Sequence, residues 1–132
     1  AEVAALIRAA AAAGASFIAT PENTTGMGQD KAELLATAPI EAQHPVVADF
    51  SALAQELRVW LLCGSAAVRD QAQDTHLRNR SLLFAPDGTV VARYDKIHRF
   101  DAELGGGESY HESKYYAAGE RAVLASAAGL TL

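Results

Sequence analysis

The chain is poor in cysteine, and this scarcity limits how the fold can be held together. Cys63 is the only cysteine among 132 residues, so the chain can form no internal disulfide. Small extracellular domains often depend on such bridges. The simplest interpretation is a protein that works in a reducing, cytoplasmic setting.

Positive charge is also scarce. The chain has 11 Lys and Arg residues against 16 Asp and Glu residues, a net charge of −5, and it has no long basic run. Nucleic acids and anionic membrane surfaces attract basic patches, so we expect neither as a partner. No apolar run approaches the roughly 20 residues that a membrane-spanning helix needs. These absences argue against nucleic-acid-binding and membrane-inserted proteins.

What is present is the composition of a globular domain. Half of the residues are hydrophobic, which is enough for one modest domain with its own core. The chain opens directly in a helical pattern, and residues 129–132 have the pattern of a buried strand that lacks its end. We therefore expect residues 1–132 to form a single domain that is truncated at both ends.

The first half of the chain alternates helices with strands, which predicts an α/β fold. Gly14 suits the end of the first helix, and Pro45 suits the start of a later one. The expected helices cover 3–13, 29–37 and 45–57, and the expected strands cover 15–19 and 58–65. On the first helix, the face expected to be buried contains Val3, Leu6, Ile7 and Ala10. The second strand is a continuous apolar run, typical of a sheet covered on both faces.

The second half opens with a hairpin signal. Residues 79–84 and 89–94 have strand patterns, and the Pro86-Asp87-Gly88 sequence between them predicts a tight turn. A loop is expected over 98–121, and a loop of that length is usually functional or disordered. The last expected elements are a strand over 122–126, a turn at 127–129 and the start of a further strand.

Three charged residues lie where an α/β sheet binds its ligands, at or after strand ends. Glu22 follows the first strand, Lys96 follows the second strand of the hairpin, and Glu112 lies in the long loop. Each residue also has an ordinary explanation. Glu22 could cap a turn, Lys96 could be a solvated charge, and Glu112 could pair with a neighbouring cation at the surface. The residues alone leave both interpretations open.

Four motifs in a fixed order carry a family resemblance. They are Gly14-Ala15 with Thr20-Pro21-Glu22-Asn23, then Pro86-Asp87-Gly88, then Tyr94-Asp95-Lys96-Ile97-His98 with Phe100-Asp101, then Glu112-Ser113 with Gly119. Glu22 and Lys96 are 74 positions apart, and Lys96 and Glu112 are 16 apart. This pattern resembles the N-terminal part of the nitrilase superfamily of carbon–nitrogen hydrolases. It looks most similar to the Nit-type amidases, the branch that holds omega-amidase and deaminated glutathione amidase.

The resemblance implies a fold and an active site. The fold is a nitrilase-like four-layer α-β-β-α sandwich, of which this chain covers about the first half, and the full protein would be a homodimer or a larger homo-oligomer. The site is a Glu–Lys–Cys triad in which Glu22 matches the general base, Lys96 the lysine and Glu112 a second glutamate. Such a base is useful if its carboxyl pKa is raised, because it must take a proton from a thiol. A fixed ammonium group can then stabilise the oxyanion formed by attack on an amide.

The nucleophile of this triad has no match in the chain. Residues 129–132 resemble the start of the strand that leads to Cys-Tyr-Asp in the family. We therefore expect the nucleophilic cysteine beyond Leu132, and we expect the isolated chain to be inactive. Cys63 lies in a core strand and is predicted to be a small buried hydrophobe.

The other polar groups near these motifs have structural interpretations. His98 is predicted to be packed at a strand end, and Arg99 is predicted to lie at the surface. The remaining histidines lack metal-ligand spacing, and the glycines at 105–107 lack the strand–glycine–helix context of a nucleotide loop. No metal and no cofactor are expected.

The expected function is hydrolysis of a small carboxylate-bearing amide to an acid and ammonia through a cysteine thioester. Two alternatives remain open from the sequence. The same triad could serve a nitrilase or an N-carbamoyl hydrolase. A protein of another class, a non-catalytic α/β assembly module without the cysteine, would share the same pattern up to Leu132.

Overall fold

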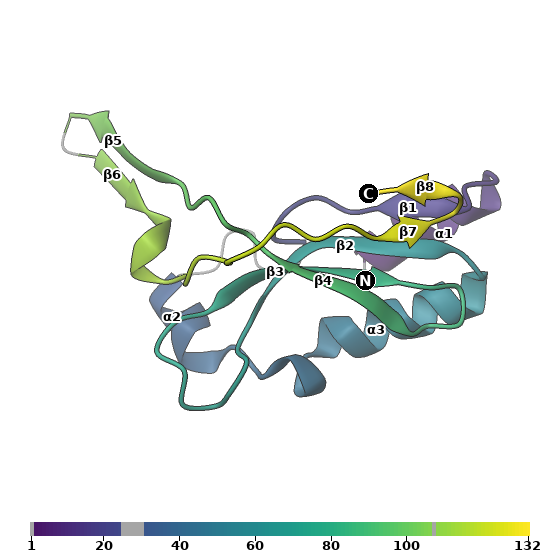
Figure 1. Ribbon diagram of the computed structural model, residues 1–132, viewed down its shortest axis with the longest axis horizontal. Coiled ribbons are helices and arrows are strands. Elements are labelled where there is room, and N and C mark those ends of the chain that lie inside the picture. The colour runs from purple at the N-terminus through teal and green to yellow at the C-terminus, as the bar shows by residue number, and fades with distance from the viewer. Residues whose placement is uncertain (1, 25–30, 107) are drawn as a thin grey trace.

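One four-stranded sheet organises the computed structural model, which describes residues 2–24, 31–106 and 108–132 (Figure 1). Its strand order is β1-β2-β3-β4, with β1 parallel to β2 and the other neighbours antiparallel. These strands are β1 Phe17–Ala19, β2 Trp60–Val68, β3 Arg78–Phe84 and β4 Val90–Asp95. Two short hairpins are formed by β5 Asp101–Gly105 with β6 Glu108–His111, and by β7 Ser126–Ala127 with β8 Leu130–Thr131.

The helices lie between the strands in the order that the sequence predicts. They are α1 Glu2–Ala12, α2 Lys31–Thr37 and α3 Pro45–Leu57, and the short 3-10 turns are η1 Glu41–Gln43 and η2 Glu112–Lys114. Helix α3 begins at Pro45, where the fixed φ of proline suits a first turn, and the His44 ring accepts a hydrogen bond from the Val46 amide at 3.2 Å. Within the described residues, no helix is long and apolar enough to cross a membrane.

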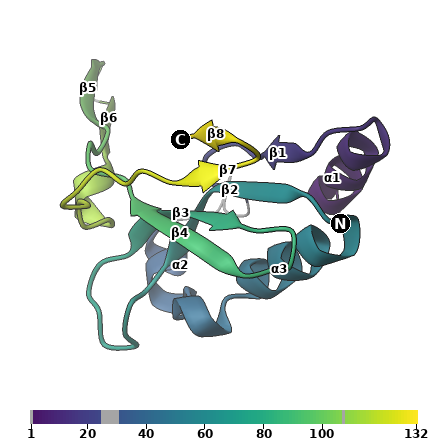
Figure 2. The same cartoon turned by 45° about the vertical axis from the view of Figure 1, so that its right-hand side comes forward.

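The elements form layers around the sheet. Helix α3 lies along one face, and the β7–β8 hairpin lies over the other (Figure 2). The β5–β6 hairpin projects away from one end of the sheet, whereas α1 lies near the other end (Figure 1). The strands therefore separate a helical face from a face crossed by the end of the chain.

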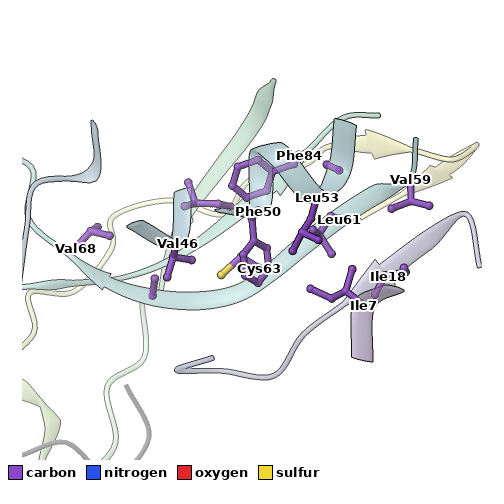
Figure 3. Packing of buried hydrophobic residues seen from close by; sticks show 13 residues of the cluster. Ile7, Ile18, Val46, Phe50, Leu53, Val59, Leu61, Cys63, Val68 and Phe84 are labelled. Carbon is purple, nitrogen blue, oxygen red and sulfur yellow. The ribbon is translucent and has the colours of Figure 1, made fainter. Parts of the chain in front are cut away.

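The core lies between the sheet and its helices (Figure 3). On β2, Leu61 and Cys63 are fully buried, while Leu62 between them is only partly buried. This alternation follows from the two-residue period of a strand. Leu61 and Cys63 pack with residues of α1, α3 and β3; the labelled members of the cluster are Ile7, Ile18, Val46, Phe50, Leu53, Val59, Leu61, Cys63, Val68 and Phe84.

The topology gathers several chain segments at one edge of the sheet. Because β1 and β2 are parallel, their carboxyl ends lie at the same edge. Because β3 and β4 run in alternating directions, β3 begins at that edge and β4 ends there. The segments after β1 and after β4 therefore lie beside the start of β3.

Several predicted boundaries in the first half are wrong. The strand expected from residue 58 begins at Trp60, because Arg58 adopts the left-handed conformation (φ 54°) that ends α3. That strand also runs on to Val68, and it is buried on both faces only over its last four residues. On α1, Leu6 is 65% exposed, since the face turned to the core is centred on Ile7. The first two residues of the helix predicted over 29–37 lie outside the described residues.

The second half differs more from the prediction. The hairpin of β3 and β4 is confirmed, including its turn. The loop predicted over 98–121 is partly wrong, because it contains the β5–β6 hairpin and η2. The strand predicted over 122–126 is also wrong, since only Ser126 of that range is in a strand. The turn predicted at 127–129 is present as Ala128-Gly129, and both residues have positive φ angles.

The core predicts a large difference between two leucines. Leu61→Ala should lower the free energy of unfolding by about 2–5 kcal/mol, because it removes buried surface and leaves a cavity. Leu124→Ala is the matched control, as Leu124 is 82% exposed, and its effect should stay within about 0.5 kcal/mol. Urea unfolding of both variants checks this. Equal losses would contradict the placement of the core.

Candidate active site

The structure brings Glu22, Lys96 and Glu112 together at the edge of the sheet. The Lys96 Nζ donates to Glu22 Oε1 at 2.9 Å and to Glu112 Oε2 at 3.0 Å. These contacts span 74 and 16 positions of the sequence. Glu112 thus bonds to Lys96, rather than to the neighbouring surface cations Lys114 and Arg121 that offered its ordinary explanation.

The loop that carries Glu22 is fixed onto β2. The Asn23 amide donates to Ser65 Oγ at 2.9 Å, and the Thr24 amide donates to the Ser65 carbonyl at 3.1 Å. Gly64 permits the close approach, since a Cβ at that position would lie 2.1 Å from the Thr20 carbonyl oxygen. Asn23 itself has φ 52°, in the left-handed region that asparagine tolerates better than most residues. The part of this loop at 25–26 lies outside the described residues.

Lys96 is held by the backbone at the end of β4. Its amide donates to the Asn79 carbonyl at 2.9 Å, and its carbonyl accepts from the Gly119 amide at 2.9 Å. A side chain at Gly119 would collide with the backbone, because its Cβ would lie 2.0 Å from the Asp95 carbonyl oxygen. The backbone of Lys96 is therefore fixed by hydrogen bonds on both sides, and this positions the side chain whose ammonium group contacts the glutamates.

Glu112 is the most buried of the three groups. It lies in η2 with 5% of its side chain exposed. Its Oε2 accepts from the Phe100 amide at 2.7 Å as well as from Lys96, and its Oε1 accepts from Asn79 Nδ2 at 3.1 Å. Both carboxylate oxygens are thus engaged, as a buried charge requires.

Asn79 is a residue of the site that sequence reasoning missed. It stands near the start of β3 with 3% exposure, and its Nδ2 also donates to Glu22 Oε1 at 2.7 Å. One sequence signal could have found it. Asn79 is an amide in a strand, next to Arg78 and before an apolar run, and strands are poor in asparagine.

The charged groups of the site shift one another's pKa values. The hydrogen bond from Lys96 is the main influence on Glu22 and lowers the pKa of its carboxyl group, against a smaller effect of burial. We expected a raised pKa at this position; the direction is opposite because the ammonium group contacts Glu22 directly. Partial burial acts to lower the pKa of Lys96, but Glu22 and Glu112 outweigh it and raise that pKa. Glu22 is thus ionised at neutral pH and able to accept a proton.

The pKa of Glu112 is also set by burial acting against hydrogen bonds, and Glu112 is the more buried of the two glutamates. Burial is the largest influence and acts to raise the pKa of its carboxyl group. The Phe100 amide, Lys96 and Asn79 together outweigh it, so the pKa lies below the ordinary value. The carboxylate is therefore better stabilised in the fold than in water.

Two cavities lie against the Glu22–Lys96 pair. One of about 180 Å³ lies beside Gly64 and Ser65, and the other of about 310 Å³ lies beside Phe100, Tyr110 and Glu112. The Phe100 and Tyr110 rings contact each other with centroids 5.6 Å apart, and the side chains are 55% and 40% exposed. The site thus combines fixed charges with an open aromatic wall.

The remaining residues singled out from the sequence lie outside this cluster. Cys63 is buried in the core, and burial raises the pKa of its thiol to about 11. His98 is exposed, so its predicted packing is wrong; the chain bends outward after β4. Arg99 is exposed as predicted. Across 2–24, 31–106 and 108–132, no three His, Cys, Asp or Glu side chains are grouped to hold a metal ion.

Comparisons with known proteins identify the family of the chain. The carbon–nitrogen hydrolase family matches residues 1–130. Human omega-amidase is 33% identical over 116 residues, which are 86% of this chain and 40% of that protein. Deaminated glutathione amidase of Synechocystis is 32% identical over 117 residues, 88% of this chain and 42% of that protein. The chain spans about two fifths of the length of these two relatives.

Solved structures show the same fold. The NitFhit protein of C. elegans superposes with a TM-score of 0.76 at 25% identity, over 92% of this chain and 29% of that one. A CN-hydrolase superfamily protein of Xanthomonas campestris gives a TM-score of 0.75 at 25% identity, over 98% and 43%. The chain therefore belongs to the carbon–nitrogen hydrolase family, and its α/β fold is that of the nitrilase superfamily.

The charge cluster predicts a pH-dependent contribution to stability. At pH 7, Glu112→Gln should lower the free energy of unfolding by about 1–3 kcal/mol, because charge-assisted hydrogen bonds are lost. The folded-state pKa of Glu112 is lowered, so this contribution is present above the unfolded pKa of about 4.3 and is lost as the pH falls through the folded pKa.

Urea unfolding between pH 7 and pH 3 measures this gap between wild type and variant. The gap should narrow as the pH falls below about 4.3. Glu120→Gln is the control, since Glu120 is exposed, and it should show no comparable gap. A Glu112→Gln gap that stays constant down to pH 3 would show that the ionised carboxylate is not what stabilises the fold.

Proposed function

We propose that the protein containing this chain hydrolyses a non-peptide carbon–nitrogen bond, converting a small carboxylate-bearing amide to an acid and ammonia. The observation that carries the proposal is the single ammonium group of Lys96, held 2.9 Å from Glu22 and 3.0 Å from Glu112. A cation fixed between two carboxylates at an open cavity can stabilise an oxyanion beside a base. Membership of the carbon–nitrogen hydrolase family supports the same chemistry.

The two glutamates differ in a way that suggests their roles. Both oxygens of Glu112 accept hydrogen bonds from the protein. Glu22 instead accepts from Asn79 and Lys96 on the same oxygen, Oε1, and no described residue donates to its Oε2. Its side chain is also 52% exposed. Glu22 is thus suited to be the general base, and Glu112 is suited to hold Lys96 charged and in place.

The proposed reaction uses these groups in sequence. Glu22 takes the proton of a cysteine thiol, and the thiolate attacks the amide carbonyl carbon. The negative charge that develops on the carbonyl oxygen is stabilised by Lys96. The proton held by Glu22 passes to the leaving nitrogen, and ammonia departs as the thioester forms. Glu22 then takes a proton from water, whose attack on the thioester releases the acid. The proton passes from Glu22 to the departing cysteine sulfur, which restores the thiol and the carboxylate.

Cys63 does not suit the role of that nucleophile. Its side chain is fully buried among the core residues, and burial raises the pKa of the thiol to about 11, far from the range of reactive thiols. We therefore propose that the attacking cysteine lies outside residues 1–132, consistent with the share of the relatives that this chain covers.

The larger cavity suggests how a substrate could sit. Phe100 and Tyr110 offer their rings to the carbon skeleton of a ligand near Lys96. Lys96 is already paired with two carboxylates, and it is the only cation among the residues that line this cavity in the described part of the chain. A second cation that binds the substrate carboxylate would then come from outside these residues.

The setting and the assembly are part of the proposal. A lone, unpaired and buried cysteine suits a reducing, cytoplasmic compartment. The proposed assembly is a homodimer, as the family resemblance implies.

Removal of either charged partner should stop the chemistry. In the protein as its gene encodes it, Glu22→Gln and Lys96→Ala should each reduce the rate of ammonia release from small carboxylate-bearing amides by about 100-fold or more. Glu120→Gln and Lys114→Ala are matched controls with exposed side chains, and they should stay near wild type.

An ammonia assay on these variants checks the roles, with circular dichroism to confirm folding. Near-normal turnover by a folded Glu22→Gln or Lys96→Ala variant would refute the assignment. The same assay with nitriles and N-carbamoyl compounds tests the substrate class. If the wild-type protein hydrolyses nitriles or N-carbamoyl compounds faster than amides, that class of compound is the substrate and the proposed amide is wrong.

The burial of Cys63 predicts that it is dispensable for catalysis. The Cys63→Ala variant should keep kcat/KM within about threefold of wild type. It should also remain sensitive to a thiol-alkylating reagent such as iodoacetamide, because the proposed nucleophile is a different cysteine. A folded variant that is inactive, or one that has become resistant to alkylation, would show that Cys63 is the reactive thiol.

A further inference from the structure

We propose that Asn79 is a positioning residue of this site. It fixes both glutamates and the lysine at once by bonding to one oxygen of Glu22, so that the other oxygen, which has no donor among the described residues, can act as the base. The inference deepens the proposed function and rests on it. Asn79 lies outside the four motifs that carry the family resemblance, and the role proposed for it follows from its contacts.

Asn79 touches all three charged residues. Its Nδ2 donates to Glu22 Oε1 at 2.7 Å and to Glu112 Oε1 at 3.1 Å, and its carbonyl accepts from the Lys96 amide at 2.9 Å. A side-chain amide has two N–H groups, so one is available for each carboxylate. The residue thus joins the segments that carry the three charged side chains. Among the described residues, the Asn79 amide and the Lys96 ammonium group are the two groups that hydrogen-bond to both glutamates.

The contacts select which oxygen of Glu22 remains available. Asn79 and Lys96 both bond to Oε1, so the described residues hold the carboxylate by this one oxygen. Oε2 has no donor among the described residues, and it can therefore accept a proton. Without Asn79, rotation about the end of the Glu22 side chain would be restrained by Lys96 alone.

A polar atom of Asn79 is buried without a hydrogen bond among the described residues, and this supports the same role. Its Oδ1 is buried and has no hydrogen-bond partner among the described residues. The opposite orientation of the amide would place this oxygen against two carboxylates, which is worse. A neutral donor between two negative groups thus explains the residue type, whereas a purely structural role would favour a side chain that satisfies all its polar atoms.

The test compares Asn79→Leu, Asn79→Asp and Ser51→Ala in the protein as its gene encodes it. Ser51 lies on α3, and its hydroxyl donates to the carbonyl of Gly88, in the turn between β3 and β4, at 2.7 Å. Its loss therefore removes a side-chain hydrogen bond at the end of β4 opposite to Lys96, and that bond involves no carboxylate. The pH dependence of kcat/KM is measured for each variant, together with the ¹³C NMR titration of the Glu22 carboxyl carbon, assigned with Glu22→Gln.

Loss of the donor should disfavour the ionised carboxylate. In Asn79→Leu, the acidic limb of kcat/KM and the Glu22 titration should both move to higher pH by about one unit, with kcat reduced about 10-fold or more. Asn79→Asp keeps the shape and adds a third carboxylate, so it should move both in the same direction and by more. If Asn79→Leu does not fold, the Asn79→Asp variant alone tests the positioning role. Ser51→Ala should lose stability, while the acidic limb and the Glu22 titration stay unmoved.

Two results separate the hypotheses. If Asn79 variants lose stability while the acidic limb and the Glu22 titration stay in place, as in Ser51→Ala, the positioning role is wrong. If wild-type protein releases no ammonia from any amide while the Glu22 titration still moves in the Asn79 variants, the proposed function is wrong, and the role of Asn79 in holding the carboxylates stands.

Discussion

One ammonium group between two carboxylates is the interaction on which the rest of the site depends. Lys96 faces two negative groups with a single positive charge, and Glu112 is almost entirely removed from water. Such a cluster is stable only if the remaining lone pairs are satisfied, since an ion pair that lacks them does not repay its desolvation. The Phe100 amide and the Asn79 side chain supply those bonds. The backbone groups that bond to this cluster must therefore be positioned as accurately as the charged side chains.

The sheet provides this accuracy through its strand directions. One parallel and two antiparallel pairings bring the end of β1, the start of β3 and the end of β4 to the same edge. Gly64 and Gly119 let backbone pass within contact distance at the points where the Glu22 loop and the Lys96 strand end are anchored. Strand ends are rigid, so the charged groups gain fixed positions without long ordered loops of their own.

The sequence predicts those parts of the molecule that local patterns control. Helix α3 follows from Pro45 and the spacing of its apolar residues, and the β3–β4 hairpin follows from its turn residues. The three charged residues could be named from motifs, and the structure shows that they meet. Asn79 was not predicted, because the one local signal, an asparagine in a strand, gains its meaning only when β3 is placed between residues 57 positions before it and 33 after it. The β5–β6 hairpin was missed since glycines and tyrosines in a polar stretch carry no clear strand alternation.

The site and the core use opposite faces of the same strands, and this separates chemistry from packing. On β3, Leu82 and Phe84 belong to the core cluster, whereas Asn79 points to the carboxylates. On β2, the pairing with β3 shifts its register between Cys63 and Ala66. Cys63 packs in the core, while Gly64 and Ser65, within that shift, support the Glu22 loop. Because strand residues alternate between faces, one residue decides whether a side chain joins the core or the site. This explains why Cys63, next to the site, is buried in the core, while Asn79 in the next strand contacts both glutamates.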